Sequence, residues 1–461
     1  MTGPRTRVSG LRLGSVLLSA ALAACGLGAD GLPPGSPVRH GFSDERLARI
    51  DAAVAREVSA RRVAGAVTLV ARDGRVVHFA ASGWRDVESA DAMRRDTIFR
   101  IASMSKAVTT VAALLLMEDG KLLLTDSVSR FLPAFRAPAV EISPADGGLH
   151  KTVQARRQVT IRDLMTHTAG YSYGGGARAD AYREVGADLW YFADRDEPIG
   201  AVVDRLARVP LEAQPGEKWI YGYSTDILGR VVEAVSGMPL DVFLRTRIFE
   251  PLRMPDTSFF LPQEKRSRLA AVYSAGKDGR IERAPQHGRD GQGEYVDGPR
   301  ACFSGGAGLL STAADYARFL QMLANGGTLD GVRLLSPKTV AFATRNQVGS
   351  LYDEGRVGFG LGFSVVEDPG RSGQPGSTGE YGWGSAYYSR YWVDPSEHLV
   401  FLILMQLIPA GELDLTERFH TLVQSALVAP SKRPDPGGGP RAARKARPLK
   451  VSLSHALPRP N

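Results

Sequence analysis

The 461-residue chain is long enough for one large domain or for two to three modest ones, and its 43 % hydrophobic content excludes a disordered chain. The net charge of +8 is concentrated at the two ends, because the first 24 residues carry arginines without acids and the segment from Ala429 is strongly basic. The part between them is near neutral, which gives no support to a nucleic-acid-binding function.

The N-terminal segment has the pattern of an export signal. Arginines precede an apolar run from Leu13 to Leu22, which is too short and too early for a membrane-spanning helix. The run ends in Leu-Ala-Ala-Cys, which resembles the lipobox of bacterial lipoproteins. Residues 1–24 are therefore predicted to be a signal peptide and Cys25 the lipidated residue, with an ordinary signal peptide as the alternative. We expect an exported chain anchored to a bacterial membrane on its periplasmic or cell-surface side.

The first predicted elements follow a tether. Residues 25–42 are rich in Gly and Pro and predict a flexible linker. Ser43 can cap a helix that carries acids in its first turn and apolar residues at Leu47, Ile50 and Val54. Residues 66–71 and 75–80 flank Asp73-Gly74, a pattern that predicts a β-hairpin.

The remaining elements place helices in the middle of the domain and strands at its end. Residues of about 123–300 predict helical segments separated by glycine-rich loops. Strands are predicted at 358–365, 387–393 and 399–405, followed by a helix at 415–428. The fold class is therefore α/β (α+β): an antiparallel sheet built from both ends of the domain at 43–429, flanked by helices, with a mainly helical subdomain inserted. The tail at 430–461 is predicted to be disordered.

Ser103 and Lys106 form the most informative motif, Ser-Met-Ser-Lys at the start of an apolar helical run. Their spacing puts the hydroxyl and the amine on one helix face, one turn apart. A serine hydroxyl needs a nearby base to become a nucleophile, and a buried lysine can be that base. The Ser-x-x-Lys pattern is typical of penicillin-recognising serine enzymes. A second copy at 274–277 lies in a polar, turn-rich segment and is interpreted as a loop.

Tyr221 is the candidate for a second proton-transfer group. It lies just before a predicted helix that Ser224 could cap, and a phenol close to a lysine cation can shuttle the serine proton. The alternative is a tyrosine that only packs in the core.

A Gly-x-Ser-x-Gly match at 170–174 offers a competing nucleophile, Ser172. An α/β-hydrolase places such a serine on a tight turn between a strand and a helix. The preceding residues 159–166 have a helical pattern and no buried strand leads in. We therefore interpret the segment as a glycine-rich loop near the cleft.

Five segments together resemble one family, the class C β-lactamase-related serine hydrolases. Its most similar branch is the family VIII carboxylesterases, which are esterases with a β-lactamase fold. The resemblance covers residues 43–429, and its segments lie at 103–106, 164–170, 215–229, 304–312 and 380–386.

The resemblance implies roles for individual residues. Ser103 would be the acylated nucleophile, Lys106 its general base, and Tyr221 the group that protonates the leaving group. The backbone N–H groups of Ser103 and of Ala386, on the late strand, would form the oxyanion hole. No cofactor or metal is expected.

Two departures from the β-lactamase pattern bear on the substrate. Tyr223 stands where β-lactamases have asparagine, and Trp383-Gly384-Ser385 replaces their Lys-Thr-Gly. The tryptophan offers an apolar wall in place of a cation, which favours neutral small or medium carboxylic esters over anionic lactams. Trp383, Gly384, Ser385 and Tyr223 are the candidate substrate-binding residues.

Two alternatives stay open. The first is a β-lactamase or a D-alanyl-D-alanine peptidase acting at the cell wall, which export would suit but the missing lysine opposes. The second is a non-catalytic surface-binding lipoprotein, which the retention of Ser103, Lys106 and Tyr221 opposes.

Overall fold

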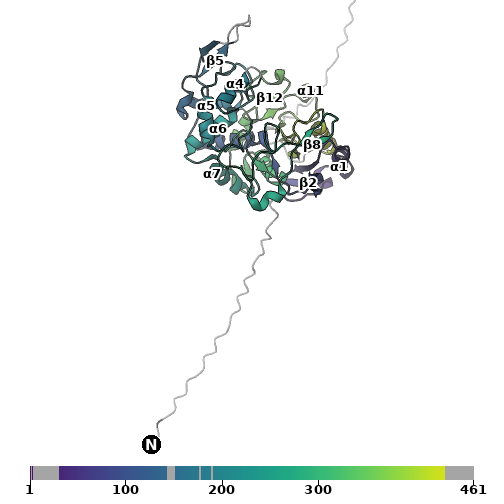
Figure 1. Ribbon diagram of the computed structural model, residues 1–461. Coiled ribbons are helices and arrows are strands. Elements are labelled where there is room, and N and C mark those ends of the chain that lie inside the picture. The colour runs from purple at the N-terminus through teal and green to yellow at the C-terminus, as the bar shows by residue number, and fades with distance from the viewer. Residues whose placement is uncertain (2, 4–30, 143–150, 176–177, 188–189, 431–461) are drawn as a thin grey trace, which may run out of the picture.

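The computed structural model describes residues 31–430 apart from 143–150, 176–177 and 188–189, together with residues 1 and 3 (Figure 1). Apart from residues 1 and 3, the predicted signal peptide lies outside the described residues, and so do Cys25 and the tail beyond residue 430. Within the described ranges, no helix combines the length and the apolar character that crossing a membrane requires.

One antiparallel sheet of eight strands organises the domain, in the order β12-β13-β14-β15-β16-β1-β2-β3. Strand β16 from the C-terminal part pairs with β1 from the N-terminal part, from Val67 opposite Leu404 to Arg72 opposite Leu399. The prediction of a sheet built from both ends of the chain is confirmed. The strands are β1 (Gly65–Arg72), β2 (Arg75–Asp86), β3 (Asp91–Ala92), β12 (Gly358–Phe359), β13 (Ser364–Val365), β14 (Tyr381–Gly384), β15 (Arg390–Asp394) and β16 (Leu399–Leu404).

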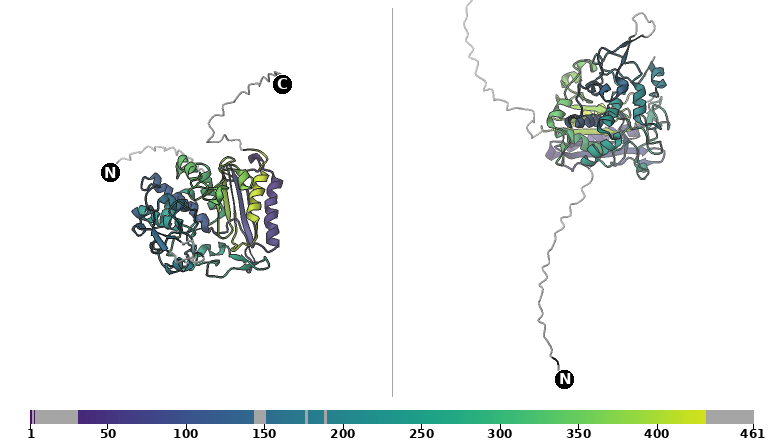
Figure 2. Two further views of the ribbon diagram at one scale, coloured as in Figure 1. Left: turned by 90° about the horizontal axis from the view of Figure 1, so that it is seen from above. Right: turned by 90° about the vertical axis from the view of Figure 1, so that its left-hand side faces the viewer.

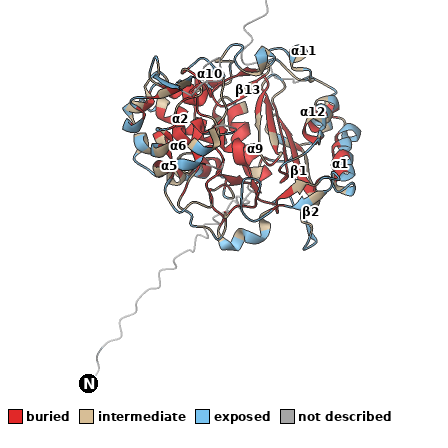
Figure 3. Cartoon of the chain, turned by 45° about the horizontal axis from the view of Figure 1, so that its top comes forward, coloured by how far each residue is buried: buried red, intermediate tan, exposed pale blue. Residues whose placement is uncertain are grey.

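Helices cover both faces of this sheet (Figures 2 and 3). Helices α1 (Asp44–Ser59) and α12 (Leu415–Ala426) lie side by side on one face, and α9 (Ala313–Ala324) packs on the other. Alternate residues of β16 therefore enter two cores, Leu402 on the α9 side and Phe401 on the α1 side. Double coverage explains why β16 is apolar throughout.

The N-terminal elements agree with the sequence in part. Ser43 caps α1 by accepting a hydrogen bond from the backbone N–H of Arg46, and the β1–β2 hairpin turns at Asp73-Gly74. The predicted tether is wrong for residues 31–42, which pack on the domain. The backbone N–H of Gly35 donates to Val76 O, and Phe42 is buried in the α1 core. The glycines and prolines of this segment give it an irregular backbone conformation and do not make it a flexible linker.

The middle of the chain is mainly helical, as expected, but it also contains two hairpins. The helices are α2 (Ser105–Glu118), α3 (Ile161–Met165), α4 (Ala179–Glu184), α5 (Ile199–Leu206), α6 (Ser224–Ser236), α7 (Leu240–Leu244) and α8 (Glu250–Leu252). The hairpins pair β5 (Ala139–Ile142) with β6 (Lys151–Gln154) and β7 (Tyr273–Ala275) with β8 (Ile281–Arg283). The second Ser-x-x-Lys copy therefore begins on a strand, where Ser274 Oγ donates to Ile408 O, and not in a loop.

Two late elements differ from the prediction. Residues 358–365 form two short paired strands, β12 and β13, because the chain reverses at Gly362, whose φ is +81°. Strand β15 begins only at Arg390, since a tight turn precedes it. The minor elements are β4 (Phe99–Arg100) paired with β9 (Leu310–Ser311), β10 (Thr328–Leu329) paired with β11 (Val332–Arg333), α10 (Pro337–Ala343) and α11 (Pro369–Ser372).

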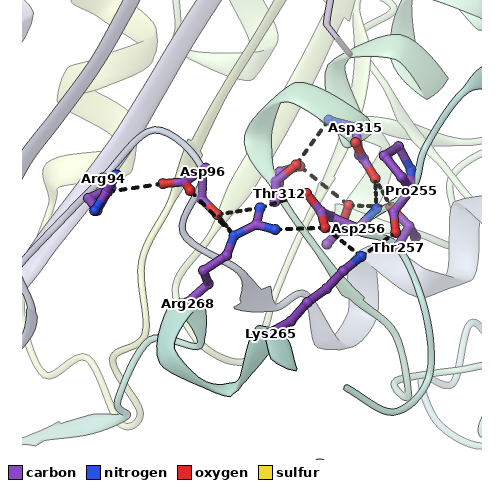
Figure 4. A network of polar contacts seen from close by, with 10 residues as sticks. Arg94, Asp96, Pro255, Asp256, Thr257, Lys265, Arg268, Thr312 and Asp315 are labelled. Atoms are coloured by element: carbon purple, nitrogen blue, oxygen red, sulfur yellow. Dashed lines mark hydrogen bonds and ion pairs between the residues drawn. The ribbon is translucent and has the colours of Figure 1, made fainter. Parts of the chain in front are cut away.

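A polar network ties the start of α9 to the segment at 255–268 (Figure 4). Asp315 Oδ2 accepts hydrogen bonds from the backbone N–H of Asp256 at 2.8 Å and from Thr257 Oγ1 at 2.9 Å. Burial raises the pKa of Asp315 to about 7. Burial also opposes charge on Asp256, but Arg268 at 2.6 Å and Lys265 at 2.8 Å outweigh it and hold the pKa of that carboxyl below its usual value. The network thus favours the protonated form of Asp315 and the ionised form of Asp256.

Candidate active site

Ser103 lies in a single 3₁₀ turn, Ala102–Met104, that leads directly into α2. Ala102 adopts a φ of +40°, a conformation that residues with a side chain rarely take, so the turn is held against its own backbone preference. The pairing of β4 with β9 and a hydrogen bond from Tyr316 Oη to Met104 O fix the turn from two sides. Ser103 is 9 % exposed among fully buried neighbours. A rigid, strained turn thus presents one hydroxyl.

Lys106 lies in the first turn of α2 and is buried. Its Nζ donates to Ser103 Oγ at 3.2 Å, to Tyr173 Oη at 2.9 Å and to the carbonyl oxygen of Gly306 at 2.8 Å. Within the part of the chain that the structure describes, no carboxylate forms an ion pair with this amine. The arrangement brings Ser103 and Lys106 together as the motif predicts and allows direct proton transfer between them.

Tyr221 contacts Lys106 through the face of its ring, and among the described residues its hydroxyl is not one of the hydrogen-bond acceptors of the amine. Lys106 Nζ lies 4.6 Å from the centre of the Tyr221 ring, over its face. The Tyr221 hydroxyl accepts a hydrogen bond from Nε1 of Trp383 at 3.2 Å. Tyr221 and Trp383 are thus joined, and the tyrosine sits within the lysine's electrostatic reach.

Tyr173 belongs to this site, although the sequence motifs did not assign it a role. Of Tyr173 and Tyr221, Tyr173 is the one whose hydroxyl accepts a hydrogen bond from Lys106 Nζ. Its position inside the Gly-Tyr-Ser-Tyr-Gly segment is the sequence feature that points to it. Burial, reinforced by Tyr221 and Asp226, raises the pKa of Tyr173 well above its ordinary value, which keeps the phenol neutral. Ser172 of the same segment instead accepts a hydrogen bond from the N–H of Gly174, in a loop that no strand enters. The segment contributes a tyrosine to the site and not a serine.

The expected second oxyanion donor, Ala386, lies in the turn that follows β14 and not on the strand itself. This turn is closed by a hydrogen bond of 2.8 Å from the N–H of Ser385 to Ser389 O, and Ser385 Oγ accepts from the N–H of Tyr387. Among the described residues the Ala386 N–H has no partner, and β14 runs beside the Ser103 turn. Ser385 therefore shapes the turn, and Gly384 ends the strand before it.

Tyr223 does not offer a surface to a substrate, which corrects the expectation for this residue. It is fully buried, and its hydroxyl donates to Ala187 O at 2.8 Å. Its ring packs edge-on against Tyr173, with 4.8 Å between the ring centres. It supports Tyr173 from behind, and the Asn-to-Tyr departure thereby changes the packing under the site.

Aromatic side chains from distant segments form one wall of the site. Trp219 stacks on Tyr221 and contacts Tyr352, while Phe359 lies edge-on to Trp383 at 5.3 Å. Trp219, Tyr352 and Trp383 are partly exposed. We call Trp219, Tyr352, Phe359 and Trp383 the aromatic wall. The sequence pointed to Trp383 alone, since the other three have no motif of their own.

His167 packs against the aromatic wall, with its ring in contact with Trp219 and Phe359. Its ring centre is 4.8 Å from that of Tyr221, its φ is +55°, and its carbonyl accepts from the N–H of Ile220. Burial, and then the charge of Lys106, lowers the pKa of His167 well below its usual value, so the ring is neutral. Among the described residues no group of His, Cys, Asp or Glu could hold a metal ion.

Comparisons with known proteins show which family the chain belongs to. The family model Beta-lactamase matches residues 50–423. The chain is 36 % identical to Protein Rv1367c of Mycobacterium tuberculosis over 375 residues, which covers 76 % of this chain and 88 % of the relative. It is 34 % identical to Esterase EstB of Burkholderia gladioli over 377 residues, covering 77 % and 89 %.

Among solved structures, EstCE1, a hydrolase with promiscuous acyltransferase activity, aligns with a TM-score of 0.71 at 29 % identity and covers 84 % of this chain and 99 % of its own. The resemblance inferred from the motifs is confirmed, and so is the fold class. The chain belongs to the beta-lactamase family and is a serine hydrolase of the β-lactamase fold, with esterases among its relatives.

Proposed function

We propose that this protein hydrolyses neutral carboxylic esters of small or medium size through an acyl-enzyme on Ser103. The observation that carries the proposal is the Ser103 hydroxyl at 3.2 Å from the buried Lys106 amine, beside a wall of uncharged aromatic rings. A neutral, apolar wall favours an ester without a carboxylate. The esterase relative EstB supports the same substrate class.

In the first half of the proposed reaction, Ser103 Oγ attacks the ester carbonyl carbon while Lys106 Nζ takes its proton. The carbonyl oxygen becomes an oxyanion, which the N–H groups of Ser103 and Ala386 stabilise. Loss of one such donor typically costs about 3 kcal/mol of transition-state stabilisation. The unpartnered Ala386 N–H beside the Ser103 turn supports this role.

Collapse of the intermediate releases an alcohol, which needs a proton. Tyr221 is the proposed donor. Lys106 then passes to Tyr221 the proton that it took from Ser103. In the second half, water attacks the acyl-Ser103 ester while Lys106 Nζ accepts its proton through Tyr221 Oη. The proton then passes from Lys106 to Ser103 Oγ as the acyl C–O bond breaks and the carboxylic acid leaves. Tyr173, held neutral by burial, keeps Lys106 in place and does not itself ionise.

The test compares turnover of p-nitrophenyl butyrate and of a chromogenic cephalosporin by the purified protein, with Ser103→Ala as the control. Ester turnover that Ser103→Ala abolishes is the expected result. Faster turnover of the cephalosporin would favour a β-lactamase or D-alanyl-D-alanine peptidase. Neither activity in a folded protein would favour the binding lipoprotein.

We further propose that the protein is exported and anchored through lipid at Cys25, on the strength of the lipobox pattern alone. Metabolic labelling with a radioactive fatty acid in a bacterial host tests this. Label is expected in the wild type and absent in Cys25→Ser. Equal labelling of both would overturn it.

A further inference from the structure

Asp226 is a buried acid beside the candidate active site that the proposed mechanism leaves without a role. It lies in the first turn of α6 and is fully buried. Its Oδ1 accepts hydrogen bonds from Ser304 Oγ at 2.6 Å and from the N–H of Gly306 at 3.1 Å. Its Oδ2 has no partner among the described residues. A side chain that only anchored this turn would not need the second oxygen or a charge.

Gly306 connects this carboxylate to Lys106. The same residue donates its N–H to Asp226 and accepts from Lys106 Nζ, at 2.8 Å, through its carbonyl. A Cβ at position 306 would lie 2.4 Å from Asp226 Oδ2, so only glycine allows this close approach. Thr109 of α2 holds the neighbouring Gly305 carbonyl at 2.7 Å and provides a neutral anchor for the same turn.

Asp226 is the acidic side chain whose negative charge can act on the Lys106 amine. Burial raises the pKa of Asp226, while Ser304 and the charge of Lys106 oppose that rise. Burial likewise raises the pKa of the Cys302 thiol and keeps it protonated. The other titratable groups that face the pair are His167, Tyr173 and Tyr221, from the loops after α3 and before α6. His167 and Tyr173 are neutral for the reasons given above.

We propose that Asp226 is the positioning residue for Lys106: it holds the Gly306 carbonyl against the amine and stabilises, across this one residue, the positive charge that Lys106 acquires from Ser103. The inference rests on the proposed function. When Ser103 Oγ forms its bond to the substrate, its proton moves to Lys106 Nζ and no further. Asp226 takes no proton in this step, and its negative charge lowers the free energy of the cation that forms.

The test is Asp226→Asn, which keeps an oxygen acceptor for Ser304 and Gly306 and removes the charge. The measured quantity is the rate at which a fluorophosphonate labels Ser103 in the purified protein, as a function of pH. Without the negative charge Lys106 releases its proton more easily, so the acid limb of the rate profile should move to lower pH by about one unit. The plateau rate should fall about tenfold because the new cation is less stabilised.

Thr109→Val is the matched control, since it removes the neutral anchor of the same turn and keeps the charge. Its acid limb should coincide with that of the wild type even if its plateau is lower. Superimposable acid limbs for the wild type and Asp226→Asn would overturn the positioning role and leave the proposed function intact. A wild type that is not labelled on Ser103 would overturn both.

Ser304→Ala is the second variant, for the case in which Asp226→Asn does not fold. It removes the 2.6 Å hydrogen bond to Asp226 Oδ1, which makes the carboxylate easier to protonate. Its acid limb should move in the same direction as that of Asp226→Asn, by a smaller amount. An unmoved limb in folded Ser304→Ala would contradict the proposal.

Discussion

The indole Nε1 of Trp383 donates a hydrogen bond of 3.2 Å to the hydroxyl of Tyr221. This contact joins the residue that replaces the lysine of β-lactamases to the proposed proton donor. A charged lysine at this position would act on the tyrosine and on the substrate alike. The tryptophan instead fixes the hydroxyl by a neutral hydrogen bond and adds an apolar surface.

Removal of this hydrogen bond should slow ester hydrolysis. Trp383→Phe keeps an aromatic ring but loses the donor, and a neutral hydrogen bond of this kind contributes about 1 kcal/mol, or roughly fivefold in kcat. Trp219→Phe is the matched variant, because the Trp219 Nε1 has no partner among the described residues. Steady-state kinetics with p-nitrophenyl butyrate should show the larger kcat loss for Trp383→Phe. Equal losses of kcat in the two variants would mean that the indole N–H of Trp383 does not contribute to the reaction.

A cation at position 383 should change the substrate preference. Trp383→Lys places an ammonium beside the site, which attracts the carboxylate of a cephalosporin and disrupts the aromatic wall. The ratio of cephalosporin to ester kcat/KM should rise about tenfold, which corresponds to about 1.4 kcal/mol. Trp383→Leu is the control, since it disrupts the wall without adding charge. The same ratio in both variants would show that charge at this position does not select the substrate.

Loss of the Tyr173 hydroxyl should affect Lys106 directly. Tyr173→Phe removes one of three acceptors of the buried amine, and hydrogen bonds to charged groups contribute about 1.5 to 3 kcal/mol. We expect kcat for ester hydrolysis to fall about 10- to 100-fold. Ser172→Ala, in the same loop, should change kcat by less than about twofold. The opposite pattern would move the nucleophile to the Gly-x-Ser-x-Gly segment.

Asp315 makes stability depend on pH. Its pKa is about 7 in the folded protein against an ordinary 3.8. Between these values the unfolded chain releases the proton while the folded protein retains it, so the stability of the fold decreases as pH rises from 4 to 7. One pKa unit corresponds to about 1.4 kcal/mol, so the total loss is a few kcal/mol.

Asp315→Asn should remove this penalty, because an amide oxygen can accept the hydrogen bonds from Asp256 and Thr257. The variant should match the wild type near pH 4 and exceed it in Tm above pH 7. Asp44→Asn, an exposed acid in α1, is the control and should follow the wild type across this range. A Tm difference for Asp315→Asn that does not change with pH would contradict the raised pKa.

Local patterns predicted the parts of the fold that depend on neighbouring residues. Helix α1 follows from the Ser43 cap and a 3.6-residue apolar period, and the first hairpin follows from Asp73-Gly74. The packed segment at 31–42 could not be predicted, because its contacts with Val76 and Arg72 come from distant residues. The break between β12 and β13 likewise depends on a reversal at Gly362 that a β-type pattern hides.

In the candidate site, too, contacts between neighbouring residues could be predicted from the sequence, and contacts between distant residues could not. Ser103 and Lys106 share one helical turn, so their contact follows from spacing alone. Tyr173 and Asp226 reach the site through tertiary packing, Tyr173 directly and Asp226 through Gly306. Three residues of the aromatic wall, Trp219, Tyr352 and Phe359, meet only in the folded chain. Sequence periodicity carries no signal for such contacts.

Direct capture of the acyl-enzyme tests the central claim. The purified protein would be mixed with p-nitrophenyl butyrate, quenched in acid within the first turnover, digested, and examined by peptide mass spectrometry. We predict one butyryl group on the peptide that contains Ser103, and none in Lys106→Ala, where the proposed base is absent. A butyryl group on Ser172, or turnover without any acylated serine, would contradict the account.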